Sequence, residues 1–489
     1  MKAAGRPRFQ PRGWRIALAT AALLAVAAAI RIRAAQNSLW LDEIVSVDLV
    51  RTLTSPLGVF TRIHSDNNHY LNSLLIYFLG FRGDWAGYRV PSILAGVGTV
   101  AVAGLIAGRR SASCALFAAL LFSFSYVFVL YSSEARGYAE LVFFSLLAYL
   151  LLGSYLDSLR WPLAVAFSLC ACLGFLSHLS FAFFFLASLP WAAIRLAKGR
   201  AKIGGLIGRL AICYGAPALL AALLYLVDIR HMAFPGGAKP GLLGSFEAAM
   251  AWDLGMPFAS TVWWMFAAAA LVFASGLVLQ WREEGDSAIF FAGMIVVAPL
   301  LLLFLSRQEV LYVRFFVVPM AFLLILLSRV LSRLWEAHGR AGRVVCCAFF
   351  AWYLAANAVP YLSLLVFGRG NNADAVQFLV RNARETPVTV VGDSDFRIGI
   401  VVDFFARAAP GGPSVTYFLA KNRPASGAEF IIREKESFED PVPPATHLVD
   451  RAGNEYGLTA VFRTAPLSGL HWFIYQRQRE GAPGGPPGA

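Results

Sequence analysis

Two adjacent acids, Asp42 and Glu43, follow directly after the first long apolar segment of the chain, residues 14–35. A carboxylate at the rim of a bilayer is costly, so an acid pair in this position is expected to bind charge or to move protons. Asp42 is our candidate for a general base that removes the proton of a hydroxyl group. A structural alternative stays open, because Asp42 can be the N-cap and Glu43 a first-turn acid of a predicted surface helix over 43–54, where the helix dipole favours negative charge.

Further ionisable side chains gather at the same ends of the predicted spans. They are Asp66 and His69 in the outer loop 36–87, Arg89 at the start of the second span, Glu134, Arg136 and Tyr138 between the third and fourth, His178 between the fifth and sixth, and Arg314 at the start of the tenth. We expect one cavity at this membrane face to bring them together.

Two of these side chains, Arg136 and Arg314, suit a phosphate, because a guanidinium is permanently charged and grips phosphate oxygens through two N–H groups. A sugar on a polyprenyl phosphate has its lipid tail in the bilayer and its phosphate at headgroup depth. Its transfer needs a cation to hold the phosphate as its charge grows, and a base for the acceptor hydroxyl. Structural alternatives remain, because Arg136 can pair with Glu134 or reach the headgroups, and His69 and His178 can be ordinary interfacial histidines.

The elements that position these side chains are predicted to be membrane helices. The chain has 489 residues, of which 58% are hydrophobic and 15% are charged, whereas soluble domains are close to half apolar and a quarter charged. About eleven apolar segments approach or reach the length needed to cross a hydrocarbon layer of about 30 Å. They cover residues 14–35, 88–108, 112–131, 138–156, 162–177, 179–196, 207–229, 259–281, 288–306, 311–331 and 344–367.

The distribution of charge predicts the orientation of the chain. Lys and Arg are concentrated in the N-terminus and in alternate short connections, which places those segments on the cytoplasmic side. The formal net charge of +13 therefore indicates topology and contact with anionic lipids, and we expect no nucleic acid partner. An odd number of spans then puts Asp42, Glu43 and the C-terminal tail on the outer face. The Gly-, Ala- and Arg-rich composition is typical of a GC-rich bacterium, and the predicted location is the bacterial inner membrane.

From about residue 368 the composition becomes that of a soluble domain. A helix is predicted over 373–384, strands over 388–392, 429–432 and 471–475, and a further apolar element over 398–406. We therefore divide the chain into a membrane domain, 1–367, an outer α/β domain, 368–480, and a Gly/Pro-rich disordered tail, 481–489. A second outer loop, 230–258, is rich in Gly and Pro and is a candidate lid.

Five short motifs, taken in order, resemble the membrane glycosyltransferases of the GT-C fold. The similarity is to the group that contains protein O-mannosyltransferases, aminoarabinose transferases of lipid A and lipopolysaccharide galacturonosyltransferases. The motifs are Asp42-Glu43, Asp66-Asn67-Asn68-His69-Tyr70, Tyr-Arg-Val-Pro-Ser at 88–92, Glu-Ala-Arg-Gly-Tyr at 134–138, and Tyr312-Val313-Arg314-Phe315. The resemblance covers most of residues 14–330 and implies a polytopic α-helical membrane protein with an outer α/β domain.

The resemblance also implies roles for these residues. Asp42 would be the catalytic base and Glu43 a helper or structural acid. Arg136 and Arg314 would contact the lipid phosphate of the donor, together with Tyr138 and Arg89. The acceptor site or its support would comprise Asp66, His69, Glu134 and His178. Where the family has a His-Pro-Pro segment, this chain has His69 followed by Tyr70 and Leu71, so both prolines are absent.

The hypothesis is a glycosyltransferase that moves one sugar, with inversion, from a polyprenyl phosphate donor to a hydroxyl of a lipid, glycan or protein acceptor. The alternative is a transporter or flippase that binds lipid-linked sugars without bond chemistry, although the two halves of the chain show no repeat of the kind common in transporters. No metal is required, but the acids near His64 and His69 could hold a divalent cation. The six cysteines lie in apolar segments and predict neither a disulfide nor a metal site.

Overall fold

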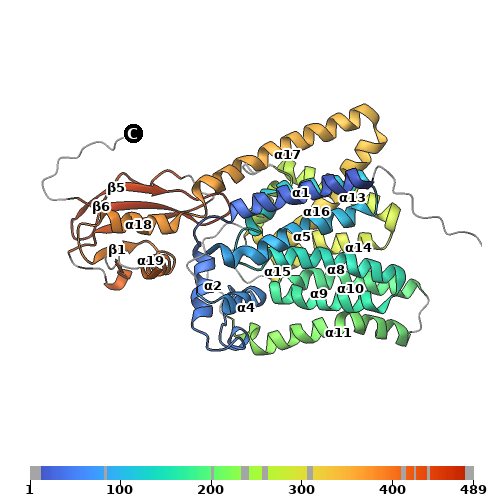
Figure 1. Ribbon diagram of the computed structural model, residues 1–489, viewed down its shortest axis with the longest axis horizontal. Coiled ribbons are helices and arrows are strands. Elements are labelled where there is room, and N and C mark those ends of the chain that lie inside the picture. Colours follow the sequence, from blue (N-terminus) through green and yellow to red (C-terminus); the bar gives the residue numbers. More distant parts are fainter. Residues whose placement is uncertain are drawn as a thin grey trace, which may run out of the picture. The chain divides into compact units, whose positions relative to one another are not determined.

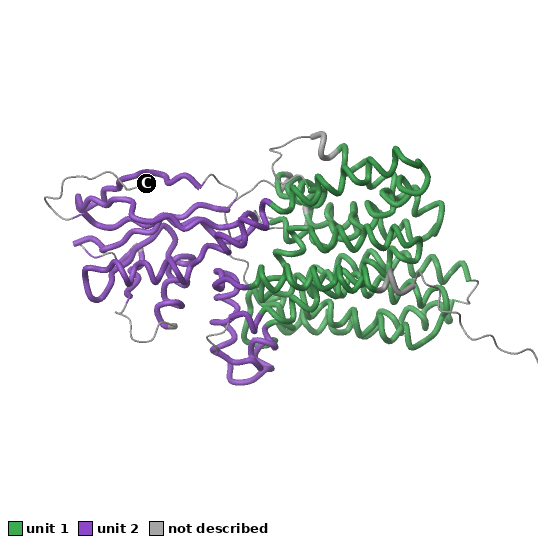
Figure 2. Tube along the Cα trace, turned by 45° about the horizontal axis from the view of Figure 1, so that its top comes forward, with its two compact units in different colours: residues 1–35, 60–72, 89–358 green, residues 36–59, 73–88, 359–489 purple. Residues whose placement is uncertain are grey.

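The computed structural model describes residues 13–81, 85–199, 203–232, 242–255, 263–305, 312–408, 415–422, 424, 426–437 and 441–478. The chain forms two compact units (Figure 2), each of which is described by itself. Unit 1 comprises Met1–Ala35, Phe60–Asn72 and Arg89–Ala358, and unit 2 comprises Gln36–Val59, Ser73–Tyr88 and Val359–Ala489. The predicted tail 481–489 and much of the predicted lid 230–258 lie outside the described residues.

Unit 1 is a bundle in which long helices run side by side (Figure 1). The helices are α1 (Gly13–Ala34), α5 (Val90–Gly108), α6 (Ala112–Phe124), α7 (Tyr126–Tyr131), α8 (Tyr138–Ser158), α9 (Trp161–Ser177), α10 (Phe181–Lys198), α11 (Ile203–Val227), α12 (Leu242–Asp253), α13 (Trp263–Glu284), α14 (Ser287–Ala292), α15 (Ala298–Leu305), α16 (Val317–Ala337) and most of α17 (Gly339–Phe367). Each apolar segment predicted from the sequence falls on one or two of them. The predicted span 112–131 is broken at Ser125, whose extended backbone separates α6 from α7.

This architecture is that of a multi-pass membrane protein. Among the described residues, six helices are long and apolar enough to cross a membrane. These six contain residues Trp85–Gly108, Tyr138–Ser158, Phe181–Lys198, Ile203–His231, Val313–Ala337 and Gly339–Asn382. Shorter apolar helices accompany them, so the count of about eleven spans remains a prediction.

Helix α16 forms the centre of unit 1. It packs against α6, α8, α12 and α13, and 89% of its most apolar stretch is buried. Its sequence from Val317 to Leu327 is apolar on every side, which is the pattern of a helix surrounded by other helices. Because α16 begins just after Arg314 and carries Arg329 near its other end, it holds polar groups at both ends of the bundle.

Unit 2 contains a six-stranded mixed sheet with the order β2-β1-β3-β6-β5-β4. The strands are β1 (Val388–Gly392), β2 (Val415–Tyr417), β3 (Phe430–Glu436), β4 (His447–Val449), β5 (Glu455–Phe462) and β6 (Leu470–Arg477). β1 is parallel to β2 and β3, and the remaining pairs are antiparallel. Two helices, α18 (Asn372–Asn382) and α19 (Arg397–Ala408), join this sheet. The five predicted elements appear as α18, β1, α19, β3 and β6, whereas β2, β4 and β5 are additional.

The segment that carries the acid pair belongs to unit 2. It begins with α2 (Leu41–Arg51), a little earlier than the helix predicted over 43–54. Helix α2 packs against α19, where Arg407 forms an ion pair of 3.0 Å with Asp48. The short helices α3 (Gly58–Thr61) and α4 (Tyr70–Leu79) each span the division between the two units.

Candidate functional site

A buried contact between Arg136 and His69 is the centre of the candidate site in unit 1. Arg136 lies in the connection between α7 and α8 and donates from Nη2 to Nε2 of His69 at 2.9 Å. Because Nε2 accepts this bond, the ring proton belongs on Nδ1, which lies 3.3 Å from the carbonyl oxygen of Ser177. His69 is therefore the neutral tautomer, and this contact leaves the positive charge of Arg136 in place.

A second histidine, His178, lies beside the first and is also neutral. The imidazole rings of His69 and His178 are 4.8 Å apart. Burial, followed by the charge of Arg136, lowers the pKa of His69 well below its usual value. The same burial, with the charges of Arg136 and Arg314, lowers the pKa of His178 to about 3. At neutral pH this histidine pair adds no charge to the site.

Aromatic rings enclose the histidines. Tyr138, the first residue of α8, lies 4.8 Å from the ring of His178 and 5.2 Å from that of His69. The guanidinium carbon of Arg136 is 5.2 Å from the centre of the Tyr138 ring, which is a cation–π distance. Tyr131, at the end of α7, lies 5.5 Å from Tyr138 on another side. These contacts fix the position of Arg136 through both its charge and its planar face.

Gly137 allows the three chain segments of this site to meet. A Cβ atom on Gly137 would lie 1.9 Å from the carbonyl oxygen of Ser177 and 2.9 Å from Nδ1 of His69. No other residue fits at that separation, because contacts below 3.0 Å require the backbone to move. In the sequence this glycine stands out only as part of the motif at 134–138. The approach of Ser177 could not be seen in the sequence.

Arg314 is the second arginine that acts on the histidine cluster. It lies in the short turn Val313–Phe316 before α16, with its guanidinium carbon 4.3 Å from the centre of the Tyr312 ring. Its charge is one of the causes that lower the pKa of His178, so it faces the same cluster as Arg136. Arg307 and Glu309, which precede Arg314 in the chain, lie outside the described residues.

Two other predicted residues of the site, Arg89 and Glu134, are buried in unit 1. Arg89 is fully buried and donates from Nη1 to the carbonyl oxygen of Ala35 at 2.6 Å, a contact that holds the C-terminal end of α1. This contact gives Arg89 a structural role that the prediction of phosphate binding did not include. Glu134 is also fully buried, two residues before Arg136. The roles of Arg89 and Glu134 in binding a donor or an acceptor stay predictions.

The remaining predicted residues of the first loop do not form a metal site. Asp66 is exposed. His64 forms an ion pair of 2.6 Å with the fully buried Asp228, which also accepts a bond of 2.8 Å from the hydroxyl of Tyr70. In the part of the chain that the structure describes, no group of three or more His, Cys, Asp or Glu is placed to hold a metal ion. Asp228 falls at the end of the predicted span 207–229, and the sequence does not show that it contacts His64 and Tyr70.

The acid pair of unit 2 divides into two different environments. Glu43 is fully buried, and its Oε2 accepts a bond of 3.2 Å from the backbone N–H of Trp40, which caps the start of α2. Asp42 is half-buried, and its carbonyl oxygen accepts from the hydroxyl of Ser46 at 2.9 Å. Glu43 thus has the structural role that was left open, and the catalytic role of Asp42 remains a prediction.

Two buried arginines were not singled out from the sequence. Arg31, near the end of α1, is fully buried and donates to the carbonyl oxygen of Phe122 at 3.0 Å. Arg369, which follows α17, is also buried, with its guanidinium carbon 5.3 Å from the centre of the Trp40 ring. Arg31 lies inside the predicted span 14–35 and Arg369 directly follows the predicted span 344–367, and the sequence gives neither of them a role.

Comparison with solved structures identifies the fold. The apo crystal structure of ArnT from Cupriavidus metallidurans matches with a TM-score of 0.56 and 13% identity, over 94% of this chain and 98% of that one. The structure of the same protein bound to undecaprenyl phosphate matches with a TM-score of 0.52 over 95% of this chain. No protein-family model matches the chain, and no curated protein matches it by sequence. The chain thus has the GT-C fold that the motifs predicted.

Proposed function

We propose that this membrane protein is a glycosyltransferase that moves one sugar from a polyprenyl phosphate donor to the hydroxyl of a lipid, glycan or protein acceptor. The observation that carries the proposal is the fold, which it shares over nearly its whole length with ArnT, a protein that binds undecaprenyl phosphate. The motif residues of unit 1 support the same chemistry, because they place two arginines around one buried cluster.

The donor phosphate is assigned to Arg136 and Arg314. A phosphate that leaves with the bonding electrons gains negative charge, which a fixed guanidinium stabilises more strongly in a buried site than in water. The two neutral histidines are compatible with this assignment, because they line the cluster without adding charge to it. Tyr138 holds Arg136 in place through its ring.

The reaction is a single displacement. The acceptor oxygen forms a bond to the anomeric carbon of the sugar while the bond from that carbon to the phosphate oxygen breaks, so the configuration inverts. The proton of the acceptor hydroxyl passes to the carboxylate of Asp42, and polyprenyl phosphate leaves with the electron pair. Asp42 is preferred to Glu43 as the base because Glu43 is engaged in capping α2.

The setting of this reaction follows from the predicted topology. The N-terminus is cytoplasmic, and the acid pair and the α/β domain face the outer side of a bacterial inner membrane. On that side a polyprenyl phosphate donor presents its phosphate at headgroup depth, with its tail in the bilayer. The fold supports a polyprenyl phosphate donor, and it defines neither the sugar nor the acceptor.

The test uses the purified full chain and a polyprenyl phosphate sugar, with release of polyprenyl phosphate as the readout. Loss of a general base costs about 10²- to 10⁴-fold in rate, so we expect Asp42→Asn to lose at least about a hundredfold. The matched control is Asp374→Asn, an exposed acid in the first turn of α18 in the same unit. Arg136→Gln is expected to slow release as well.

Two outcomes would overturn the proposal. If Asp42→Asn releases polyprenyl phosphate as fast as the wild type, Asp42 is not the base. If the wild-type protein releases none from any donor but carries lipid-linked sugar across vesicles, the protein is a transporter.

A further inference from the structure

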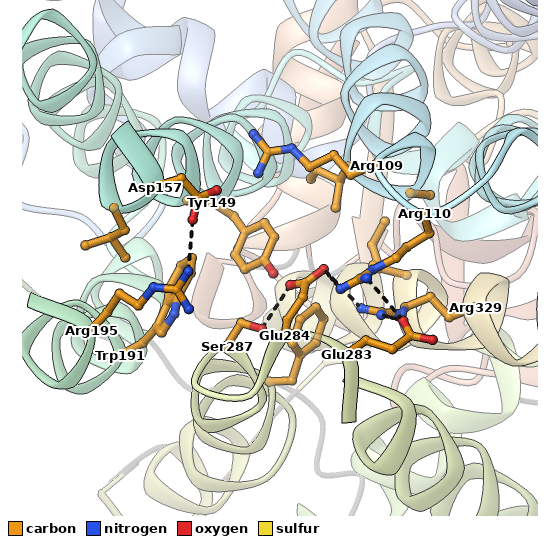
Figure 3. Close-up of a pocket in the computed structure, with 16 residues that line it drawn as sticks. Arg109, Arg110, Tyr149, Asp157, Trp191, Arg195, Glu283, Glu284, Ser287 and Arg329 are labelled. Carbon is orange, nitrogen blue, oxygen red and sulfur yellow. Dashed lines mark hydrogen bonds and ion pairs between the residues drawn. The ribbon is translucent and has the colours of Figure 1, made fainter. Parts of the chain in front are cut away.

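A polar cavity of about 360 Å³ lies in unit 1 among the ends of α5, α8, α10, α13, α14 and α16 (Figure 3). Helix α8 begins at Tyr138, in the candidate site, and carries Asp157 into the cavity near its other end. At 1.5 Å per residue this helix is about 30 Å long, the thickness of a hydrocarbon layer. Helix α16 likewise begins after Arg314 and carries Arg329 into the cavity. The cavity is therefore at the opposite ends of the helices from the candidate site.

Four of the charged residues that line the cavity neutralise one another. Arg110 forms ion pairs with Glu284 and, at 3.4 Å, with Glu283. Arg329 lies 2.5 Å from Glu283 and 3.7 Å from Glu284. Figure 3 shows these side chains converging on one wall of the cavity. This quartet joins three helix ends and has a structural role.

A second group on the opposite wall is also balanced. Arg195 lies 3.0 Å from Asp157 and 3.4 Å from Asp286. Lys198 forms a further ion pair with Asp286. Two bases therefore face two acids, and this group adds no net charge to the cavity.

Arg109 is the exception among the arginines. Its guanidinium donates to the hydroxyl of Ser154 at 2.5 Å and to the carbonyl oxygen of Leu150 at 3.3 Å, both of which are neutral. Within the described residues it has no acidic partner. Exposed at the mouth of the cavity, it supplies one positive charge that the protein itself does not neutralise.

Tyr149 gives the cavity a second polar group that points to a ligand. This residue is only 6% exposed. Its ring is held by Trp191 at 5.2 Å and by Phe290 at 5.0 Å, and its hydroxyl points into the cavity (Figure 3). Across the described ranges the structure gives this hydroxyl no hydrogen-bond partner. Because this hydroxyl is open to the cavity, a group that enters the cavity is expected to accept its hydrogen bond.

We propose that this cavity binds the phosphate headgroup of a membrane lipid, with Arg109 as the cation and Tyr149 as the hydrogen-bond donor. A lipid phosphodiester carries one negative charge, which matches the one charge that the lining leaves over. The apolar part of the lining, which includes Trp191, Phe291 and Leu156, suits the first carbons of an acyl chain. The proposal does not depend on the glycosyltransferase reaction, because the cavity is at the other end of the bundle.

The experiment measures lipid binding to the purified full chain in detergent, by native mass spectrometry with phosphatidylglycerol. Arg109→Gln is expected to weaken binding about tenfold, the effect of one charge-assisted hydrogen bond, and Tyr149→Phe about threefold. The matched control is Arg160→Gln, which removes an exposed arginine that follows α8 at the same face but does not line the cavity. Tyr149→Phe removes one oxygen only, so the fold is expected to persist, and its melting temperature checks this.

The proposal is supported if Arg109→Gln and Tyr149→Phe weaken binding while Arg160→Gln does not. It is overturned if all three variants bind as the wild type does, or if Arg160→Gln is as weak as Arg109→Gln, since binding would then be to general surface charge. A competition arm adds inorganic phosphate. If phosphate displaces the lipid at equal concentration, the cavity is a site for a soluble phosphate and the lipid assignment is wrong.

Discussion

At one end of α8, Arg136 donates to the neutral imidazole of His69, whereas at the other end Arg110 and Arg329 are paired with two glutamates. The first arrangement holds a guanidinium by its geometry and keeps its charge. The second cancels charge and ties helix ends together. The same bundle therefore uses arginine in two ways, in contact with a neutral ring at one end and in ion pairs with carboxylates at the other.

The test with the largest expected effect compares Gly137, just before α8, with Gly153 on α8. Gly137→Ala would drive a Cβ to 1.9 Å from the carbonyl oxygen of Ser177, so we expect a loss of about 4 kcal/mol in the free energy of unfolding and loss of transfer activity. Gly153→Ala, at the cavity end, would bring a Cβ to 3.3 Å from Nη1 of Arg109, which is the flexible end of a side chain. We expect that variant to change stability by less than about 1 kcal/mol. Unfolding in SDS titrations measures both, and equal losses would show that the two ends are equally tightly packed.

A second test uses pH, because the site end contains His69 and His178, whose pKa values are lowered, whereas no histidine is among the described residues that line the cavity. A histidine whose pKa is lower in the folded protein than in the unfolded chain takes up a proton on unfolding. For His178, with a folded pKa of about 3 and an unfolded pKa of about 6.5, stability is full above pH 6.5 and falls as the pH is lowered. Between pH 6.5 and pH 5 the loss is about 2 kcal/mol for one such histidine.

The measurement is the free energy of unfolding in SDS at several pH values. His178→Gln should flatten the decline below pH 6.5. The exposed His447 of unit 2 provides the control, and His447→Gln should leave the curve of unit 1 unchanged. A decline of the same slope in the His178→Gln protein would contradict the assignment of a neutral, buried imidazole.

The smallest expected effect concerns the charge quartet of the cavity. Glu283→Gln removes one partner of Arg329, but Glu283 is 39% exposed and Glu284 remains 3.7 Å from Arg329. We expect a loss of about 1 kcal/mol at most, which high salt reduces further. Thermal unfolding at low and high salt measures it, with Glu247→Gln on α12 as the control. A loss above about 3 kcal/mol would mean that the quartet behaves as a buried network.

Hydropathy predicted the helices of unit 1 because a long apolar segment has few other stable structures in a membrane. The break at Ser125 was not visible, since the residues on both sides of it are apolar and only the packing of α6 and α7 requires it. In unit 2, β2 and β4 are three residues long, too short to show a periodic pattern. β5 contains Gly457, and buried and exposed residues do not alternate regularly along it, so this strand could not be predicted from the sequence either.

The candidate site was predicted in part. Arg136, Tyr138, His69 and His178 come together because each lies at the same end of a predicted span, which the order of spans was enough to indicate. The tautomer of His69 depends on the carbonyl oxygen of Ser177, 108 residues away, and the partner of His64 is 164 residues away. Contacts of this kind depend on how the helices pack, and no local pattern encodes them.

The two outermost strands of the sheet in unit 2, β2 and β4, have only three residues each. An edge strand offers a row of backbone N–H and C=O groups to any passing strand, and a short edge leaves few of them. Proteins confined to a membrane meet one another often and in similar orientations, so a long open edge on such a domain would invite copies to join into aggregates. By ending its sheet in two very short strands, the α/β domain of unit 2 limits this hazard while the four inner strands keep their full pairing.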